Sequence, residues 1–91
     1  MANWKNKIDI SEQFRKYQNK EITVNDVIDS LVAELSKIRP VYNFINGIIL
    51  KLKELKETTY EEEEKEEGFD CILESLYDWG DRGNRLWIGT M

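Results

Sequence analysis

The chain is poor in the residues that carry most enzyme chemistry: among its 91 residues it has no histidine, one cysteine and one proline. The chain therefore lacks the commonest general base and the commonest metal ligand, although carboxylates, lysine or tyrosine can also transfer protons. The lone Cys71 cannot form an internal disulfide or a zinc cluster, and its place in an apolar helical pattern favours a small hydrophobic side chain over a reactive thiol. No phosphate-binding loop, nucleophile motif or catalytic pair of carboxylates is present. We therefore expect no catalytic residues, no metal site and no cofactor, in a protein that is not an enzyme.

Long apolar segments are also missing from the chain. No run approaches the roughly 18 residues that cross a bilayer. Residues 1–18 lack the continuous apolar core of a signal peptide. The expected location is therefore the cytoplasm, without membrane contact.

Apolar residues instead recur at spacings of three and four, which is typical of amphipathic helices. The composition, 41% hydrophobic and 34% charged, suits a folded domain of this length. We predict an all-α fold in which residues 1–91 form one domain. It would be a small bundle of about four helices, with a polar arm at residues 1–7 and a short extended C-terminal tail.

The first pair of helices is predicted over residues 8–39. Asp9 is expected to cap a helix over residues 10–18. Thr23 is expected to cap the second helix, which stops near Arg39 because the next residue is proline. This second helix has the clearest apolar stripe in the chain, formed by Val24, Val27, Ile28, Leu31, Leu35 and Ile38.

The rest of the chain divides into three predicted parts. A third helix spans residues 41–57. Residues 58–68 are interpreted as a mobile acidic connector or a frayed first helical turn, because like charges four residues apart repel each other in a helix. Thr58 or Thr59 is a candidate cap there, with Glu62 as the capping-box partner of Thr59. The last helix runs from Phe69 to about Trp79, and together with the aromatic tail it makes up residues 69–91.

Charge is divided unevenly along the chain: residues 1–56 carry a net charge of +3, whereas residues 57–91 carry −8. An acidic surface attracts basic partners and disfavours direct binding of nucleic acid. The functional interpretation is that carboxylates imitate nucleic-acid phosphates in a partner's basic groove. The alternative is a solvated loop that keeps the protein soluble. The candidate partner-binding acids are Glu61, Glu62, Glu63, Glu64, Glu66 and Glu67.

The C-terminal sequence LYDWGDRGNRLWIG, at residues 76–89, combines tryptophan, tyrosine and arginine, which dominate interface hot spots. Trp79 continues the last helical stripe, so we expect it to close the core. For Trp87, packing on the core and contact with a partner both stay open. Arg82 and Arg85 are expected to be exposed contact residues.

This tail, together with the acidic stretch and FDCILESL before it, resembles the C-terminal part of small bacteriophage-encoded proteins. Those proteins end in a Leu-Tyr-Asp-Trp-Ala-Asp segment followed by Asn-Arg and then Trp-Ile. The stretch KIDISEQFRKYQNKEITVNDVIDSLVAEL is similar to their opening residues, and Gly80 replaces the alanine of the pattern. The resemblance implies a phage origin, a bacterial host cell and, by association with anti-CRISPR proteins, the inhibition of a host enzyme. It implies no site residues.

These patterns lead to a functional hypothesis. The chain is expected to be a small acidic binding protein that inhibits a host nucleic-acid-binding or defence enzyme by occupying its basic surface. The alternative is a small structural protein, such as a homodimer that buries apolar helix faces. In that case the acidic segment would only be solvated.

Overall fold

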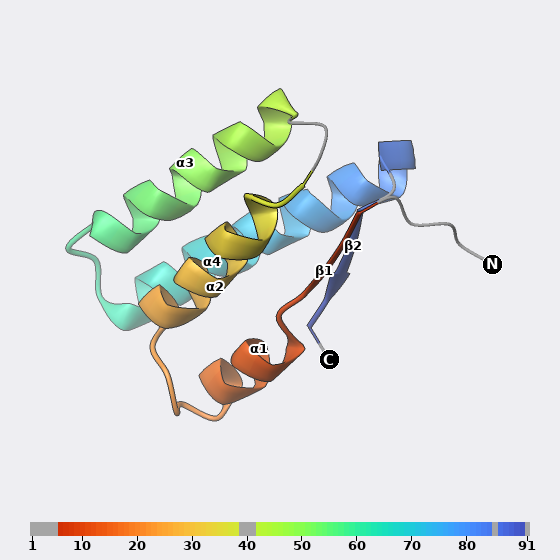
Figure 1. Ribbon diagram of the computed structural model, residues 1–91. Helices are drawn as coiled ribbons and strands as arrows, with labels where there is room; N and C mark the ends of the chain where they lie inside the picture. The colour runs from red at the N-terminus through yellow and green to blue at the C-terminus, as the bar shows by residue number, and fades with distance from the viewer. Residues whose placement is uncertain (1–5, 39–41, 85, 91) are drawn as a thin grey trace.

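The computed structural model describes residues 6–38, 42–84 and 86–90 (Figure 1). Within them the chain forms four helices, a π-helical turn and a two-stranded parallel sheet. The elements in chain order are β1 (Asn6–Asp9), α1 (Ser11–Gln18), α2 (Val24–Leu35), α3 (Asn43–Glu57), α4 (Glu62–Trp79), η1 (Gly80–Asn84) and β2 (Leu86–Gly89). The predicted helical bundle is confirmed, and a strand before α1 is an addition to it.

Helix α2 lies at the centre of the bundle and contacts the other three helices (Figure 1). Its predicted start is confirmed by a capping box. The Thr23 hydroxyl accepts a hydrogen bond from the backbone N–H of Asp26, whose carboxylate accepts one from the backbone N–H of Thr23. The helix ends at Leu35, before the expected end near Arg39, which lies outside the described residues. All six residues of its predicted apolar stripe are buried.

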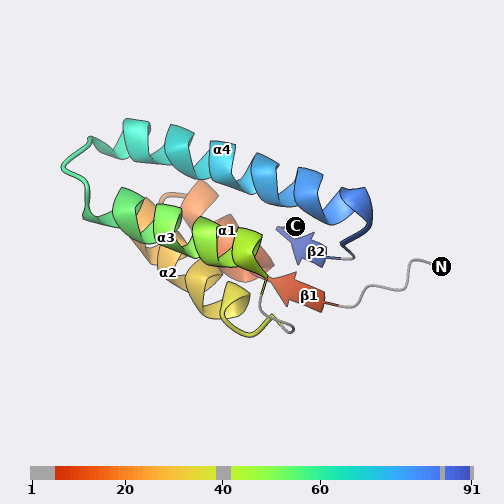
Figure 2. The ribbon, with the colours of Figure 1, turned by 90° about the horizontal axis from the view of Figure 1, so that it is seen from above.

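The core is formed between α2 and the elements that surround it. Seen from above, α4 runs along one side of the molecule and the two strands lie beside its C-terminal half (Figure 2). Each element contributes buried apolar side chains at the spacing of its own period. These are Ile45, Ile48 and Leu52 from α3, Phe69, Leu73 and Leu76 from α4, and Ile8, Leu86 and Ile88 from the strands.

The two strands join the beginning of the described chain to its end. They are parallel, with Lys7 opposite Trp87 and Ile8 opposite Ile88. Parallel strands need a long crossover connection, and here all four helices supply it. Side chains alternate across the sheet, so Ile8 is buried while Lys7 is exposed. The predicted polar arm at residues 1–7 is thus wrong for its last two residues, which belong to β1.

Helix α1 begins one residue later than expected and lacks the predicted cap. The Asp9 carboxylate accepts hydrogen bonds from the backbone N–H of Ser11 (2.9 Å) and from its hydroxyl (2.6 Å). These bonds lower the pKa of Asp9 below its ordinary value. Ile10 instead extends the sheet, because its N–H donates to the carbonyl of Gly89. Asp9 therefore turns the chain from β1 into α1.

The end of α1 is closed by a left-handed residue, Lys20, whose φ is 63°. The N–H of Lys20 donates to the carbonyl of Tyr17, and the N–H of Glu21 donates to that of Lys16. This is the Schellman pattern, in which glycine is usual at the left-handed position. The turn places the Lys20 side chain next to the space between α1 and α4.

The acidic residues do not form the predicted connector. Helix α4 begins at Glu62, so the connector proposed over residues 58–68 shrinks to the short link between α3 and α4. The prediction considered only the repulsion between like charges within the segment. In the folded protein, contacts with α2 and α3 offset this repulsion. Cys71 is exposed, so it lies outside the apolar face of the helix. Two residues after the buried Phe69, it lies on the opposite side of the helix.

The third helix begins at Asn43, two residues after its predicted start, and ends at Glu57 as expected. Residues 39–41, which include the expected start, lie outside the described residues. The last helix ends at Trp79 as predicted and then widens into η1. The extended segment expected near the C-terminus is confirmed as β2.

Two glycines predict opposite effects of the same substitution. An added Cβ at Gly80 would lie 2.7 Å from the carbonyl oxygen of Leu86, whereas nothing lies within 4 Å of one at Gly47. We expect Gly80→Ala to destabilise the protein by about 1–3 kcal/mol through forced backbone movement. Gly47→Ala should stabilise it by about 1 kcal/mol through helix propensity. Urea unfolding of both variants checks this, and a G80A variant as stable as the native protein would contradict the close approach.

Candidate functional site

The acidic end of α4 is held against α2 by a carboxylate. Glu62 Oε1 accepts a hydrogen bond of 2.8 Å from the backbone N–H of Val24. Val24 is the first residue of α2, where backbone N–H groups lack partners within the helix. A negative charge at this end also interacts favourably with the helix dipole. Glu62 therefore stabilises α2. The expected cap of α4 at Thr58 or Thr59 is wrong, because Glu61 is the N-cap residue of this helix.

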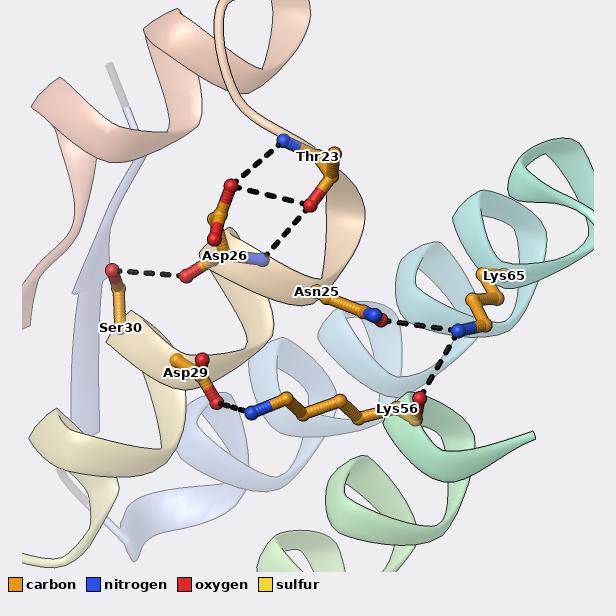
Figure 3. A network of polar contacts seen from close by, with 7 residues as sticks. All are labelled: Thr23, Asn25, Asp26, Asp29, Ser30, Lys56 and Lys65. Atoms are coloured by element: carbon orange, nitrogen blue, oxygen red, sulfur yellow. Dashed lines mark hydrogen bonds and ion pairs between the residues drawn. The ribbon is translucent and has the colours of Figure 1, made fainter. Parts of the chain in front are cut away.

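The acidic end is held against α3 by a buried lysine. Lys65 is only 8% exposed, and its ammonium group donates to the carbonyl of Lys56 (3.0 Å) and to Oδ1 of Asn25 (3.2 Å) (Figure 3). The Lys56 carbonyl belongs to the last turn of α3, where cations are favoured. The Lys56 side chain in turn pairs with Asp29 of α2 at 2.6 Å. These contacts connect α2, α3 and α4 in one polar network.

The burial of Lys65 leaves α4 with a negative exterior. The helix contains eight acidic residues, and Lys65 is its one basic residue. Five exposed acids follow one another at helical spacings of three or four, so they share a face. At a rise of about 1.5 Å per residue, they extend over about 22 Å. We call this set the acidic stripe: Glu63, Glu67, Asp70, Glu74 and Asp78.

Partial burial and charge repulsion act on one carboxylate of the acidic stripe, Asp70. Partial burial and the nearby charge of Glu74 raise the pKa of Asp70 above its ordinary value of 3.8. At the C-terminal end of the stripe, Asp78 pairs with Arg82 at 3.1 Å. That pair is exposed on both sides and contributes little to stability. The stripe is therefore least compensated between Glu63 and Glu74.

The six predicted partner-binding glutamates occupy different faces of α4. Glu63 and Glu67 belong to the acidic stripe, and Glu64 is exposed beside it. Glu61 is the N-cap residue of α4, and its backbone carbonyl accepts from the N–H of Lys65. Glu66 is half-buried toward α1. Asp70, Glu74 and Asp78 were not among the predicted partner-binding residues, although their spacing continues the pattern of Glu63 and Glu67.

The predicted contact residues of the tail are separated from one another. Arg82 is exposed in η1, and Arg85 lies outside the described residues. Trp87 is 39% exposed on the outer face of the sheet. The space beside the Gly89 α-carbon is occupied by the Trp87 ring, since an added Cβ there would lie 2.5 Å from a ring atom. Trp87 thus covers the sheet and keeps part of its ring accessible.

The expectation that Trp79 closes the core is confirmed. It is half-buried and packs against the core cluster. Its ring stacks on Phe44 with centroids 5.1 Å apart and an interplanar angle of 7°, and the edge of Tyr42 completes the contact. This cluster joins the start of α3 to the end of α4.

The described residues contain no helix long and apolar enough to cross a membrane, and no group of three or more acidic or cysteine side chains arranged to hold a metal ion. Comparisons with protein-family models, with curated proteins and with solved structures find no match to this chain. The geometry of the acidic stripe therefore carries the functional inference.

Replacement of Lys65 tests whether the acidic helix depends on its buried cation. We expect Lys65→Met to lower the free energy of unfolding by about 1–3 kcal/mol, because buried acceptors lose their charged donor. Lys53→Met, at an exposed position of α3, is the matched control and should change it by less than about 0.5 kcal/mol. Urea unfolding followed by circular dichroism measures both. Equal effects would contradict the structural role of Lys65.

The raised pKa of Asp70 predicts a pH-dependent effect on stability. Above the raised folded-state pKa, ionised Asp70 costs stability relative to the unfolded chain, whose value is near 3.8. Asp70→Asn should therefore be more stable than the native protein at neutral pH. The advantage should shrink as pH falls and vanish below 3.8. Unfolding at several pH values checks this, with Glu54→Gln on α3 as a control for the loss of one negative charge.

Proposed function

We propose that the protein is a non-enzymatic binding protein that inhibits a nucleic-acid-binding enzyme by covering the enzyme's basic surface with the acidic stripe. The observation that carries the proposal is the one-sided charge of α4. Its single lysine is buried, and five carboxylates line its outer face. A basic groove that normally holds phosphates would find complementary charge there.

The spacing of the acidic stripe supports mimicry of nucleic acid. Its carboxylates follow one another about every 4.5–6 Å along the helix axis. One DNA strand carries a phosphate about every 3.4 Å of axis. The stripe is therefore a sparser line of negative charge on a comparable scale. Basic side chains are long and flexible, so they can adjust to this difference.

The cellular setting of this proposal comes from the tail of the chain. Its similarity to small phage proteins favours a bacterial host and an anti-CRISPR-like role against a defence nuclease. Arg82 and Trp87 offer further contacts near the end of α4, since both are exposed. Arginine and tryptophan are the residue types that most often anchor interfaces.

A charge-neutral variant of the stripe tests the proposal. The triple variant Glu63→Gln, Glu67→Gln and Glu74→Gln should retain at least tenfold less basic nucleic-acid-binding protein from a bacterial lysate than the native protein does. The physical reason is the loss of an attraction that added salt also weakens. Quantitative mass spectrometry of the captured proteins measures the difference. A competition assay then checks whether the captured enzyme loses its nucleic acid.

The matched control removes the same charge from other parts of the surface. The triple variant Glu12→Gln, Glu54→Gln and Glu57→Gln should capture the same proteins as the native chain. Equal losses in both variants would show that net charge alone matters. Light scattering adds a further check, because a stable oligomer that buries the stripe would support the structural alternative.

A further inference from the structure

A groove separates α1 from α4 on the side of the helix next to the acidic stripe. It has a volume of about 400 Å³ and is lined by Phe14, Tyr17, Gln18, Lys20, Glu66 and Asp70. A second hollow beside it shares Tyr17, Lys20 and Glu66, and reaches Glu62 and Asp26. The two hollows form a continuous surface along the start of α4, with carboxylates on one wall and aromatic rings on the other.

The aromatic wall has a fixed geometry. The rings of Phe14 and Tyr17 have centroids 5.7 Å apart, and both pack against Phe69, at 6.5 Å and 5.8 Å. Phe69 is fully buried, so it anchors the two half-buried rings from below. These two rings pack against the core and present an aromatic surface on one side of the groove.

The opposite wall gives the groove a negative potential. Burial raises the pKa of Tyr17, and the charges of Glu66, Asp70 and Glu62 raise it further. The Tyr17 phenol therefore stays protonated, and the negative charges of all three carboxylates act at this position in the groove. Lys20 is the cation that lines the groove among the described residues, and it is exposed at the turn after α1. An incoming positive charge meets favourable carboxylates and one repulsive ammonium group.

We propose that this groove receives an arginine side chain of the basic partner, with its guanidinium against Tyr17 and Phe14 and its N–H groups directed to Glu66 and Asp70. This inference rests on the proposed function, because it assigns a specific subsite to the basic surface. Arginine fits better than lysine: its planar guanidinium stacks on aromatic rings and donates to carboxylates through a fork of N–H groups. A lysine ammonium is a compact and more strongly hydrated charge.

A nuclear magnetic resonance titration tests the groove with small probes. The probe is a blocked Gly-Arg-Gly tripeptide, compared with the same peptide containing lysine or citrulline. The arginine peptide should shift the amide signals of residues around Tyr17 and Glu66, and should bind at least threefold more tightly than the lysine peptide. The citrulline peptide keeps the shape but lacks the charge, so it should not bind.

Variants locate the binding within the groove. Glu66→Gln should weaken the arginine peptide about fivefold to tenfold through loss of a charge-assisted hydrogen bond. Tyr17→Leu, which keeps an apolar side chain, should weaken it about twofold to fivefold. Lys20→Asn should strengthen it by removing the competing charge. Glu54→Gln removes the same charge as Glu66→Gln at an exposed position of α3, outside both the groove and the acidic stripe, and should leave binding unchanged.

The failure of this inference is distinguishable from failure of the proposed function. A nonalysine peptide tests the acidic stripe, since it needs only a line of negative charge. If it binds the native protein and not the triple stripe variant, while arginine and lysine tripeptides bind equally or shift signals elsewhere, the groove assignment is wrong and the stripe proposal stands. If the nonalysine peptide does not bind at all, the proposed function is wrong.

Discussion

The ammonium group of Lys65 holds the first turn of α4 against the ends of α2 and α3. Moving a charge out of water is costly unless hydrogen bonds and opposite charge compensate it. Here the compensation comes from an α3 carbonyl at the negative end of a helix and from the Asn25 amide oxygen. Glu62 makes the complementary contact with the positive end of α2. The positive end of α2 and the negative end of α3 thus stabilise the first turn of α4, whose like charges would repel one another in an isolated helix.

The same contact determines the distribution of charge at the surface. If Lys65 pointed to solvent, it would pair with glutamates one turn away and weaken the negative electrostatic potential at the surface of α4. Its burial removes the only cation of the helix from the outside. The interaction that stabilises the helix is therefore also the one that makes its exterior uniformly acidic. Stability and the candidate function depend on one side chain.

Local patterns in the sequence were sufficient to predict the helices with strong apolar periodicity. The stripe from Val24 to Leu35 and the capping box at Thr23 are properties of one segment, so α2 was predicted well. The start of α4 was not predicted, because Glu62 and Lys65 contact Val24 and Asn25, which lie 38 and 40 residues away in sequence. Strand β1 was missed for a related reason. Its alternation of Lys7, Ile8, Asp9 and Ile10 is short, and its pairing partner lies at the other end of the chain. The later residues of the acidic stripe, from Asp70 onward, can be assigned to the same face as Glu63 and Glu67 only when residues 62–79 are known to form one continuous helix.

Both ends of α4 are held by contacts with other elements, so the helix is ordered before any partner binds. Its first turn is held by Glu62 and Lys65, and its last turn continues into η1, where Gly80 packs against the backbone of Leu86 in β2. The carboxylates between these anchors project from a backbone that is already ordered. A flexible acidic loop would lose conformational entropy on binding, whereas this helix has lost it during folding. In the proposed function, the parallel sheet and the buried lysine, although they lie outside the stripe, would lower the entropic cost of binding by keeping the stripe ordered.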